Sequence, residues 1–163
     1  MQPNSSLFEP VILVADDRED DIVLTRQALV RANVLNPLQV AHDGEEAIQY
    51  LEGVGRFGNR AEYPLPDLML LDLNMPRMSG FEVLRWVRAH QTLKALRIVV
   101  LSTSSDPADI DKAHELGANA FLVKVSDFKT YCRMLEAAVF FWFELCRAPS
   151  VRRPGNGQQV EAH

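Results

Sequence analysis

Cysteine is scarce in this chain: the two cysteines, Cys132 and Cys146, fall in one segment that we expect to be helical. Their separation of 14 residues, at a rise of about 1.5 Å per residue, places them about 21 Å apart. A disulfide requires Cα atoms within about 7 Å, so these cysteines cannot bond to each other. We expect two reduced side chains with no redox or metal-binding role.

Long apolar runs and an excess of positive charge are also missing. The longest apolar run, residues 137–143, is far shorter than the roughly 20 residues of a membrane span, and residues 1–10 lack the basic and apolar parts of a signal peptide. The formal net charge of -5 argues against a general nucleic-acid binder, which presents a basic face to phosphates. The sequence therefore predicts a cytoplasmic protein with no nucleic-acid and no membrane partner.

Short apolar runs alternate five times with amphipathic segments. The expected strands are residues 11–15, 38–41, 67–72, 97–102 and 120–124, and the expected helices are residues 20–33, 43–53, 80–90, 108–116 and 127–146. This alternation indicates βαβ units, and the unbroken apolar strands indicate a sheet covered on both faces. We predict an α/β domain with a doubly wound five-stranded parallel sheet, (βα)5. It spans residues 10–147, between an N-terminal extension (1–9) and a disordered tail (148–163) rich in Pro, Gly and Gln.

Polar residues stand at the ends of four expected strands: Asp16 and Asp17, then Asp72, then Ser102 and Thr103, then Lys124. Because carboxyl ends of parallel strands share one edge, these side chains should converge there. Singly, each has an ordinary explanation: a helix cap for an aspartate, a turn residue for the serine, a surface lysine. Three carboxylates about 5 Å apart, however, repel by roughly 3 kcal/mol per pair at an effective dielectric near 20. Their joint occurrence predicts a bound cation.

Oxygen ligands of this kind suit Mg²⁺, which takes one or two carboxylates and keeps several waters. A metal with open positions attracts phosphate. Lys124 would add a positive charge for a phosphoryl oxygen, and Ser102 a hydroxyl donor. Since positioning and charge neutralisation supply most of the catalysis of phosphoryl transfer, these residues predict a phosphoryl-binding site.

Four motifs are closely similar to those of a known family: "ILVADD" (12–17), "LLDLNMPRMSG" (70–80), "VVLSTS" (99–104) and "ANAFLVK" (118–124). Over roughly residues 10 to 146 the chain resembles the response-regulator receiver domains of two-component signalling. The resemblance implies a flavodoxin-like receiver fold and a single-domain response regulator, not a turnover enzyme, that accepts a phosphoryl group from a sensor histidine kinase. The implied roles are the phosphoacceptor for Asp72, Mg²⁺ ligands for Asp16, Asp17, Asp72 and the Asn74 main-chain carbonyl, the switch pair for Ser102 and Phe121, and the phosphate partner for Lys124.

Two residues depart from the family pattern. Val125 stands where many receivers have a proline in a cis peptide, and Phe121 stands where tyrosine is common. The insertion at 53–66, the "STSSDP" run and the aromatic last helix resemble stand-alone receivers that partner bacterial phytochromes. The resemblance thus implies a bacteriophytochrome as the kinase.

The last expected helix has more apolar residues than a single buried face can hold. A stripe through Leu135, Val139 and Trp142 can face the sheet, which leaves Phe140, Phe141 and Phe143 on other faces. Packing against a neighbouring helix or against residues 7–8 could cover them. We favour a homodimer through Phe140, Phe141, Trp142 and Phe143, because exposed aromatic patches mark contact surfaces.

Two other functions compete. A phosphatase of the haloacid-dehalogenase type also uses an aspartate nucleophile with Mg²⁺, but it needs a second acid two residues later, where this chain has Asn74. A degenerate receiver that only scaffolds partners would lack the acidic residues that are present here.

Overall fold

Five parallel strands form the centre of the computed structural model, which describes residues 9–147. The strands are β1 (Ile12–Ala15), β2 (Leu38–Ala41), β3 (Leu68–Leu71), β4 (Arg97–Ser102) and β5 (Ala120–Val123). They lie in the order β2-β1-β3-β4-β5, with every neighbouring pair parallel. The predicted doubly wound, flavodoxin-like sheet is confirmed. Of the predicted extension and tail, residues 1–8 and 148–163 lie outside the described residues.

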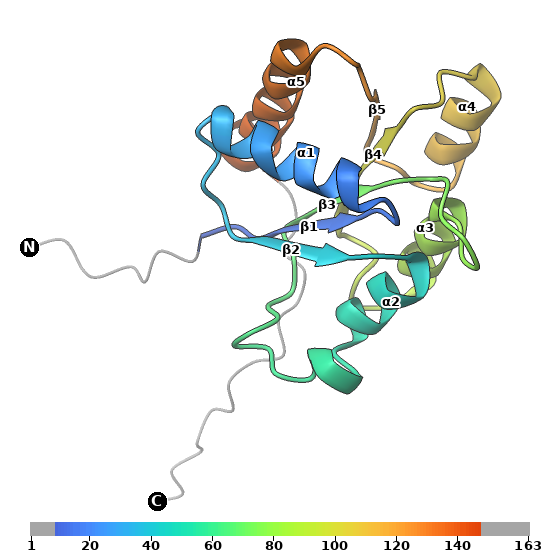
Figure 1. Ribbon diagram of the computed structural model, residues 1–163. Coiled ribbons are helices and arrows are strands. Elements are labelled where there is room, and N and C mark those ends of the chain that lie inside the picture. The colour runs from blue at the N-terminus through green and yellow to red at the C-terminus, as the bar shows by residue number, and fades with distance from the viewer. Residues whose placement is uncertain (1–8, 148–163) are drawn as a thin grey trace, which may run out of the picture.

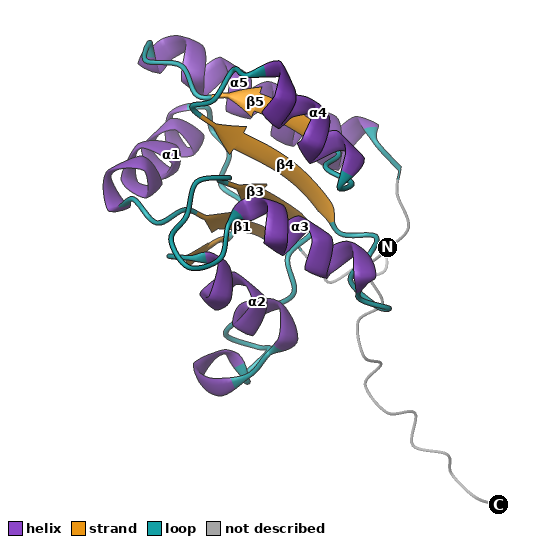
Figure 2. Cartoon of the chain, turned by 90° about the vertical axis from the view of Figure 1, so that its right-hand side faces the viewer, coloured by secondary structure: helices purple, strands orange, loops and turns teal. Residues whose placement is uncertain are grey.

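Helices cover both faces of this sheet. They are α1 (Glu19–Arg31), α2 (Gly44–Glu52), α3 (Gly80–Ala89), α4 (Pro107–Glu115) and α5 (Phe128–Phe140), with a short 3₁₀ turn at Gly55–Phe57. Figures 1 and 2 show α1 and α5 on one face and α2, α3 and α4 on the other. Alternate strand residues therefore enter two separate cores: Leu13 and Met69 pack on the α2–α4 side, and Ile12 and Leu68 on the α1–α5 side.

The helix after β3 begins very close to the end of that strand. A capping box starts α3, in which the Ser79 hydroxyl accepts from the Glu82 N–H and the Glu82 carboxylate accepts from the Ser79 N–H. A Cβ at Gly80 would lie 2.3 Å from the Asp72 carbonyl oxygen. Glycine at this position is thus what allows α3 to start against the loop that carries Asp72.

The inserted segment 53–66 is held by one arginine. The Arg60 guanidinium donates to the carbonyl oxygens of Tyr50 and Leu51 at the end of α2, both at 2.7 Å, and to that of Tyr63 at 3.1 Å. Phe57 is buried between the rings of Tyr50 and Tyr63. The insertion extends the α2 side of the core, and its Arg56 pairs with Glu46 in the first turn of α2.

The end of α5 differs in part from the sequence prediction. Leu135 and Val139 are buried, as predicted, while Phe140 and Phe141 keep 54% and 48% of their surface exposed. The expectation that Phe143 faces outward is wrong, because it packs with Trp142 against the α1–α5 core. Phe143 follows the buried Val139 by four residues, a spacing that keeps both side chains on one face of a helix, and the chain continues there as a π-helical turn over Phe141–Leu145.

Both cysteines are free, with Cys132 buried and Cys146 half-buried. Within residues 9–147, every helix is too short or too polar to cross a membrane.

Candidate acidic site at the sheet edge

The predicted convergence of the three aspartates is confirmed. Asp16 and Asp72 follow β1 and β3, and backbone hydrogen bonds continue to them, from the Asp16 N–H to the Ala41 oxygen and from the Asp72 N–H to the Ala15 oxygen. Single carboxylate oxygens of Asp16, Asp17 and Asp72 all lie within 4.8 Å of one another. Asp16 and Asp72 are buried, whereas Asp17 is exposed, so the group opens to solvent on one side.

Lys124 enters this group from the end of β5. Its Nζ donates to Asp16 Oδ2 at 2.7 Å and to Asp21 Oδ2 at 3.1 Å, and it lies 3.9 Å from Asp72 Oδ1. Burial by itself would lower the pKa of Lys124, but its hydrogen bonds and attraction to these carboxylates prevail and raise that pKa. The lysine is therefore held as a buried cation.

Asp21 was not predicted. It lies in the first turn of α1, four residues after Asp17, which precedes the helix. That spacing was the available signal, but it could not show that a residue on another element would reach back to α1. The contact joins residues 103 positions apart.

Burial raises the pKa of Asp72 to about 6. Lys124 opposes this rise, Asp16 and Asp17 add to it by repulsion, and a hydrogen bond from the Asn74 N–H opposes it. A cation among the three carboxylates would remove their repulsion. The donor set consists of carboxylate oxygens with an exposed side, which fits a hard divalent ion such as Mg²⁺.

Ser102 is fully buried at the end of β4, next to the predicted site. Its Oγ accepts a hydrogen bond from the Ser104 N–H at 3.1 Å, and the Ser104 hydroxyl donates to Asp109 Oδ2 at 2.6 Å. The Ser102 hydroxyl is thus engaged by its own loop. Phe121 is half-buried against the α2–α4 core.

The peptide bond between Lys124 and Val125 is trans, since residues 9–147 contain no cis peptide bond. Val125 packs against the α1–α5 core. The lysine therefore reaches the site without the cis-proline loop common in the family.

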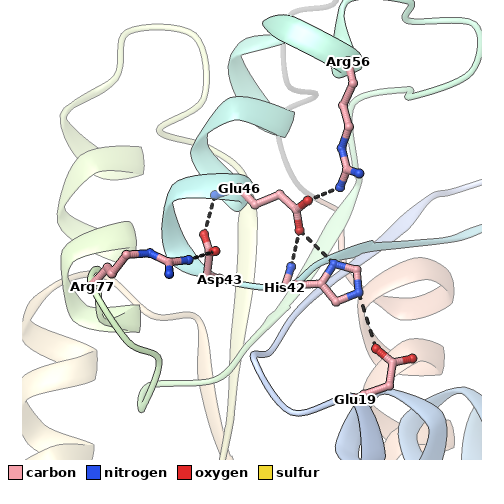
Figure 3. Close-up of polar contacts among 6 residues, drawn as sticks. All are labelled: Glu19, His42, Asp43, Glu46, Arg56 and Arg77. Carbon is pink, nitrogen blue, oxygen red and sulfur yellow. Dashed lines mark hydrogen bonds and ion pairs between the residues drawn. The ribbon is translucent and has the colours of Figure 1, made fainter.

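A polar network borders the site on the α2 side (Figure 3). Glu46 accepts from the His42 ring at 2.9 Å and pairs with Arg56, and His42 also lies 3.5 Å from Glu19 of α1. Arg77, from the loop after Asp72, pairs with Asp43 at the start of α2. The arginines and His42 in these pairs are exposed, so each pair stabilises little, but together the pairs join α1, α2 and the loop that carries the acidic site.

Comparison with known proteins agrees with this site. The response regulator receiver domain family matches residues 12–136. The response regulator Rcp1 of Synechocystis sp. is 33% identical over 140 residues, which cover 86% of this chain and 93% of that protein. The structure of its Mn²⁺-bound form has a TM-score of 0.76 and covers 86% of this chain and 99% of that one.

Two further solved structures are similar. The response regulator RPA3017, in red light signalling of R. palustris, has a TM-score of 0.82 at 35% identity and covers 86% of this chain and 99% of that one. The phosphorylated cyanobacterial phytochrome response regulator RcpA has a TM-score of 0.79 at 33% identity, covering 87% and 99%.

Proposed function

Because this chain belongs to the response regulator receiver domain family, we propose that Asp72 accepts a phosphoryl group from a sensor histidine kinase and that the signal leaves through altered protein contacts. The protein is a phosphoacceptor rather than a turnover enzyme. One observation carries the proposal: Asp16, Asp17, Asp72 and Lys124 meet at the carboxyl edge of the sheet.

In the transfer step, a carboxylate oxygen of Asp72 forms a bond to phosphorus as the bond between phosphorus and the kinase histidine nitrogen breaks. The electron pair stays on the histidine ring, which takes a proton from solvent. Loss of the signal is hydrolysis: water attacks phosphorus, the bond from phosphorus to Asp72 breaks, and phosphate leaves. Lys124 stabilises the phosphoryl oxygens by charge in both steps.

Asp16, Asp17, Asp72 and the Asn74 main-chain carbonyl would hold Mg²⁺, which when bound neutralises the carboxylates and the charge that develops on the phosphoryl oxygens. Support for a divalent ion comes from the oxygen donors of this chain and from the Mn²⁺-bound form of Rcp1.

The switch pair acts after the transfer. We expect the Ser102 hydroxyl to leave the Ser104 N–H and donate to a phosphoryl oxygen, and the Phe121 ring to move into the space behind it. This changes the surface around α4 and β5. The names of the relatives, which include a phytochrome response regulator, support a bacteriophytochrome as the kinase.

We further propose that the end of α5 forms a homodimer contact. Phe140, Phe141 and Leu145 present apolar surface there, while Trp142 and Phe143 pack inward beneath them. Sedimentation velocity tests this proposal: Phe140→Glu should shift the protein to monomer, whereas Lys129→Ser, an exposed change at the other end of α5, should not. A wild-type protein that sediments as a monomer at all concentrations would contradict it.

Incubation with acetyl phosphate and Mg²⁺ tests phosphoryl acceptance, read by intact-protein mass. Wild type should gain one phosphoryl group, Asp72→Asn none, and Asp111→Asn, an exposed aspartate of α4, as much as wild type. Absence of any gain would favour the degenerate scaffold. Sustained release of phosphate from small phosphate esters would favour a phosphatase.

A further inference from the structure

Lys124 is not centred on the phosphoacceptor. Its Nζ hydrogen-bonds Asp16 and Asp21, at 2.7 and 3.1 Å, but lies 3.9 Å from Asp72 Oδ1, beyond hydrogen-bond range. We propose that Asp21 is a positioning residue that draws Lys124 away from Asp72 and thereby slows phosphoryl uptake. This inference rests on the proposed function of Asp72.

Lys124 has few alternative hydrogen-bond partners in this arrangement. An ammonium has three N–H donors, and Asp16 and Asp21 occupy two of them. The Lys124 side chain is 11% exposed, so water offers little replacement for a contact that is given up. The third donor is left for a phosphoryl oxygen on Asp72, and as Nζ moves closer to Asp72 than its present 3.9 Å, its bond to Asp16 or to Asp21 lengthens.

The hydrogen bond from Lys124 to Asp16 is not the one that merely restrains the lysine. It belongs to the aspartate group that suits a cation, and its other oxygen accepts from the Arg18 N–H at 2.9 Å. Asp21 stands outside that aspartate group. Its contact with Lys124 is therefore the one that the transfer step does not require.

Asp21 is also held in place, so it cannot simply travel with the lysine. One turn later on α1, the Thr25 hydroxyl and the Tyr131 hydroxyl of α5 form a buried hydrogen bond of 2.8 Å. Ile22, the next residue, is buried in the core between these helices. Figure 1 shows α1 lying beside α5. Movement of Lys124 toward Asp72 thus lengthens its bond to Asp21.

Asp21→Asn keeps the shape of the side chain and removes its charge. Lys124 should then shift toward Asp72, and the rate of phosphorylation by acetyl phosphate should rise about tenfold. A tenfold change corresponds to about 1.4 kcal/mol. The matched control is Asp20→Asn, which removes the same charge from the exposed neighbouring position of α1. Asp21→Glu restores a carboxylate and should bring the rate back toward that of wild type.

A second measurement follows the lysine itself. In ¹⁵N-lysine-labelled protein without a phosphodonor, the Lys124 Nζ resonance, assigned by its loss in Lys124→Arg, should move in Asp21→Asn and stay in Asp20→Asn. A residue with a merely structural role would leave this signal in place. Urea unfolding of each variant checks folding, and Asp21→Ser replaces Asp21→Asn if the latter is unfolded.

These measurements distinguish a failure of the role of Asp21 from a failure of the function of Asp72. If wild type accepts a phosphoryl group but Asp21→Asn reacts no faster than Asp20→Asn, or if Asp21→Glu is as fast as Asp21→Asn, the role of Asp21 is refuted and the function of Asp72 stands. An unmoved Lys124 resonance in Asp21→Asn also refutes it. If wild type accepts no phosphoryl group, the proposed function fails and this inference fails with it.

Discussion

Replacing Asp72 with asparagine should stabilise the metal-free protein at neutral pH, even though it removes the phosphoacceptor. Burial, reinforced by the charges of Asp16 and Asp17, raises the pKa of Asp72 from its ordinary value of 3.8 to about 6. One pKa unit is equivalent to about 1.4 kcal/mol, so the charged form costs the folded state about 3 kcal/mol. The side chain is only 8% exposed, which leaves little room for screening by solvent.

The sign of the effect follows from linkage. A carboxyl group whose pKa is raised by folding favours the folded state fully below about pH 4, and that contribution is lost as the pH rises through about 6. Asparagine carries no charge at any pH and can still accept the hydrogen bond from the Asn74 N–H. The gain in stability from Asp72→Asn should therefore be near zero at pH 4 and about 3 kcal/mol at pH 7.5.

Urea unfolding in EDTA at pH 4, 6 and 7.5 measures this gain, with Asp111→Asn on the exposed face of α4 as control. Thermal unfolding at pH 7.5 should show a Tm about 6–12 °C higher for Asp72→Asn, since each kcal/mol shifts the Tm of a domain of this size by about 2–4 °C. Added Mg²⁺ should raise the stability of wild type more than that of the variant. A gain that is the same at all three pH values, or a loss at pH 7.5, would refute the reasoning.

Two further predictions concern the frame that carries the site. Gly80→Ala should destabilise the protein by several kcal/mol, because the new Cβ would meet the Asp72 carbonyl oxygen at 2.3 Å and Leu73 Cα at 2.8 Å. Urea unfolding measures this loss of stability, and a loss below 1 kcal/mol would mean that the loop adapts freely. Tyr131→Phe should lower the free energy of unfolding by about 1–3 kcal/mol, because the buried Thr25 hydroxyl loses its partner. Adding Thr25→Val should recover part of that loss, so strictly additive effects in the double variant would contradict the pairing.

Much of the site could be read from the chain because its residues stand at the ends of apolar runs. Asp16 and Asp72 each follow a strand directly, Ser102 is the last residue of β4, and a parallel sheet places all such ends on one edge. The local motifs around them also carry the likeness to the receiver family. Both signals depend only on short stretches of sequence.

Other features were not predicted, and most of these depend on contacts between distant segments or on the local conformation of a loop. Asp21 reads as an ordinary polar position near the start of a helix, and its role depends on where the Lys124 side chain ends. The hydrogen bond from the Ser104 N–H to the Ser102 hydroxyl is set by a loop conformation that spacing does not reveal. Phe143 differs, because it follows the buried Val139 by four residues, a spacing that already places both side chains on one helix face.

The amino-acid sequence by itself determined the order of strands and helices and the presence of an acidic edge, because apolar periodicity and strand-end chemistry are local properties of the chain. Only the tertiary structure decided how the charges there are shared. Lys124 Nζ contacts Asp16 and Asp21 more closely than Asp72, and the pKa of Asp72 is raised by burial. Both properties depend on distances and burial that exist only once α1, β1, β3 and β5 are packed together.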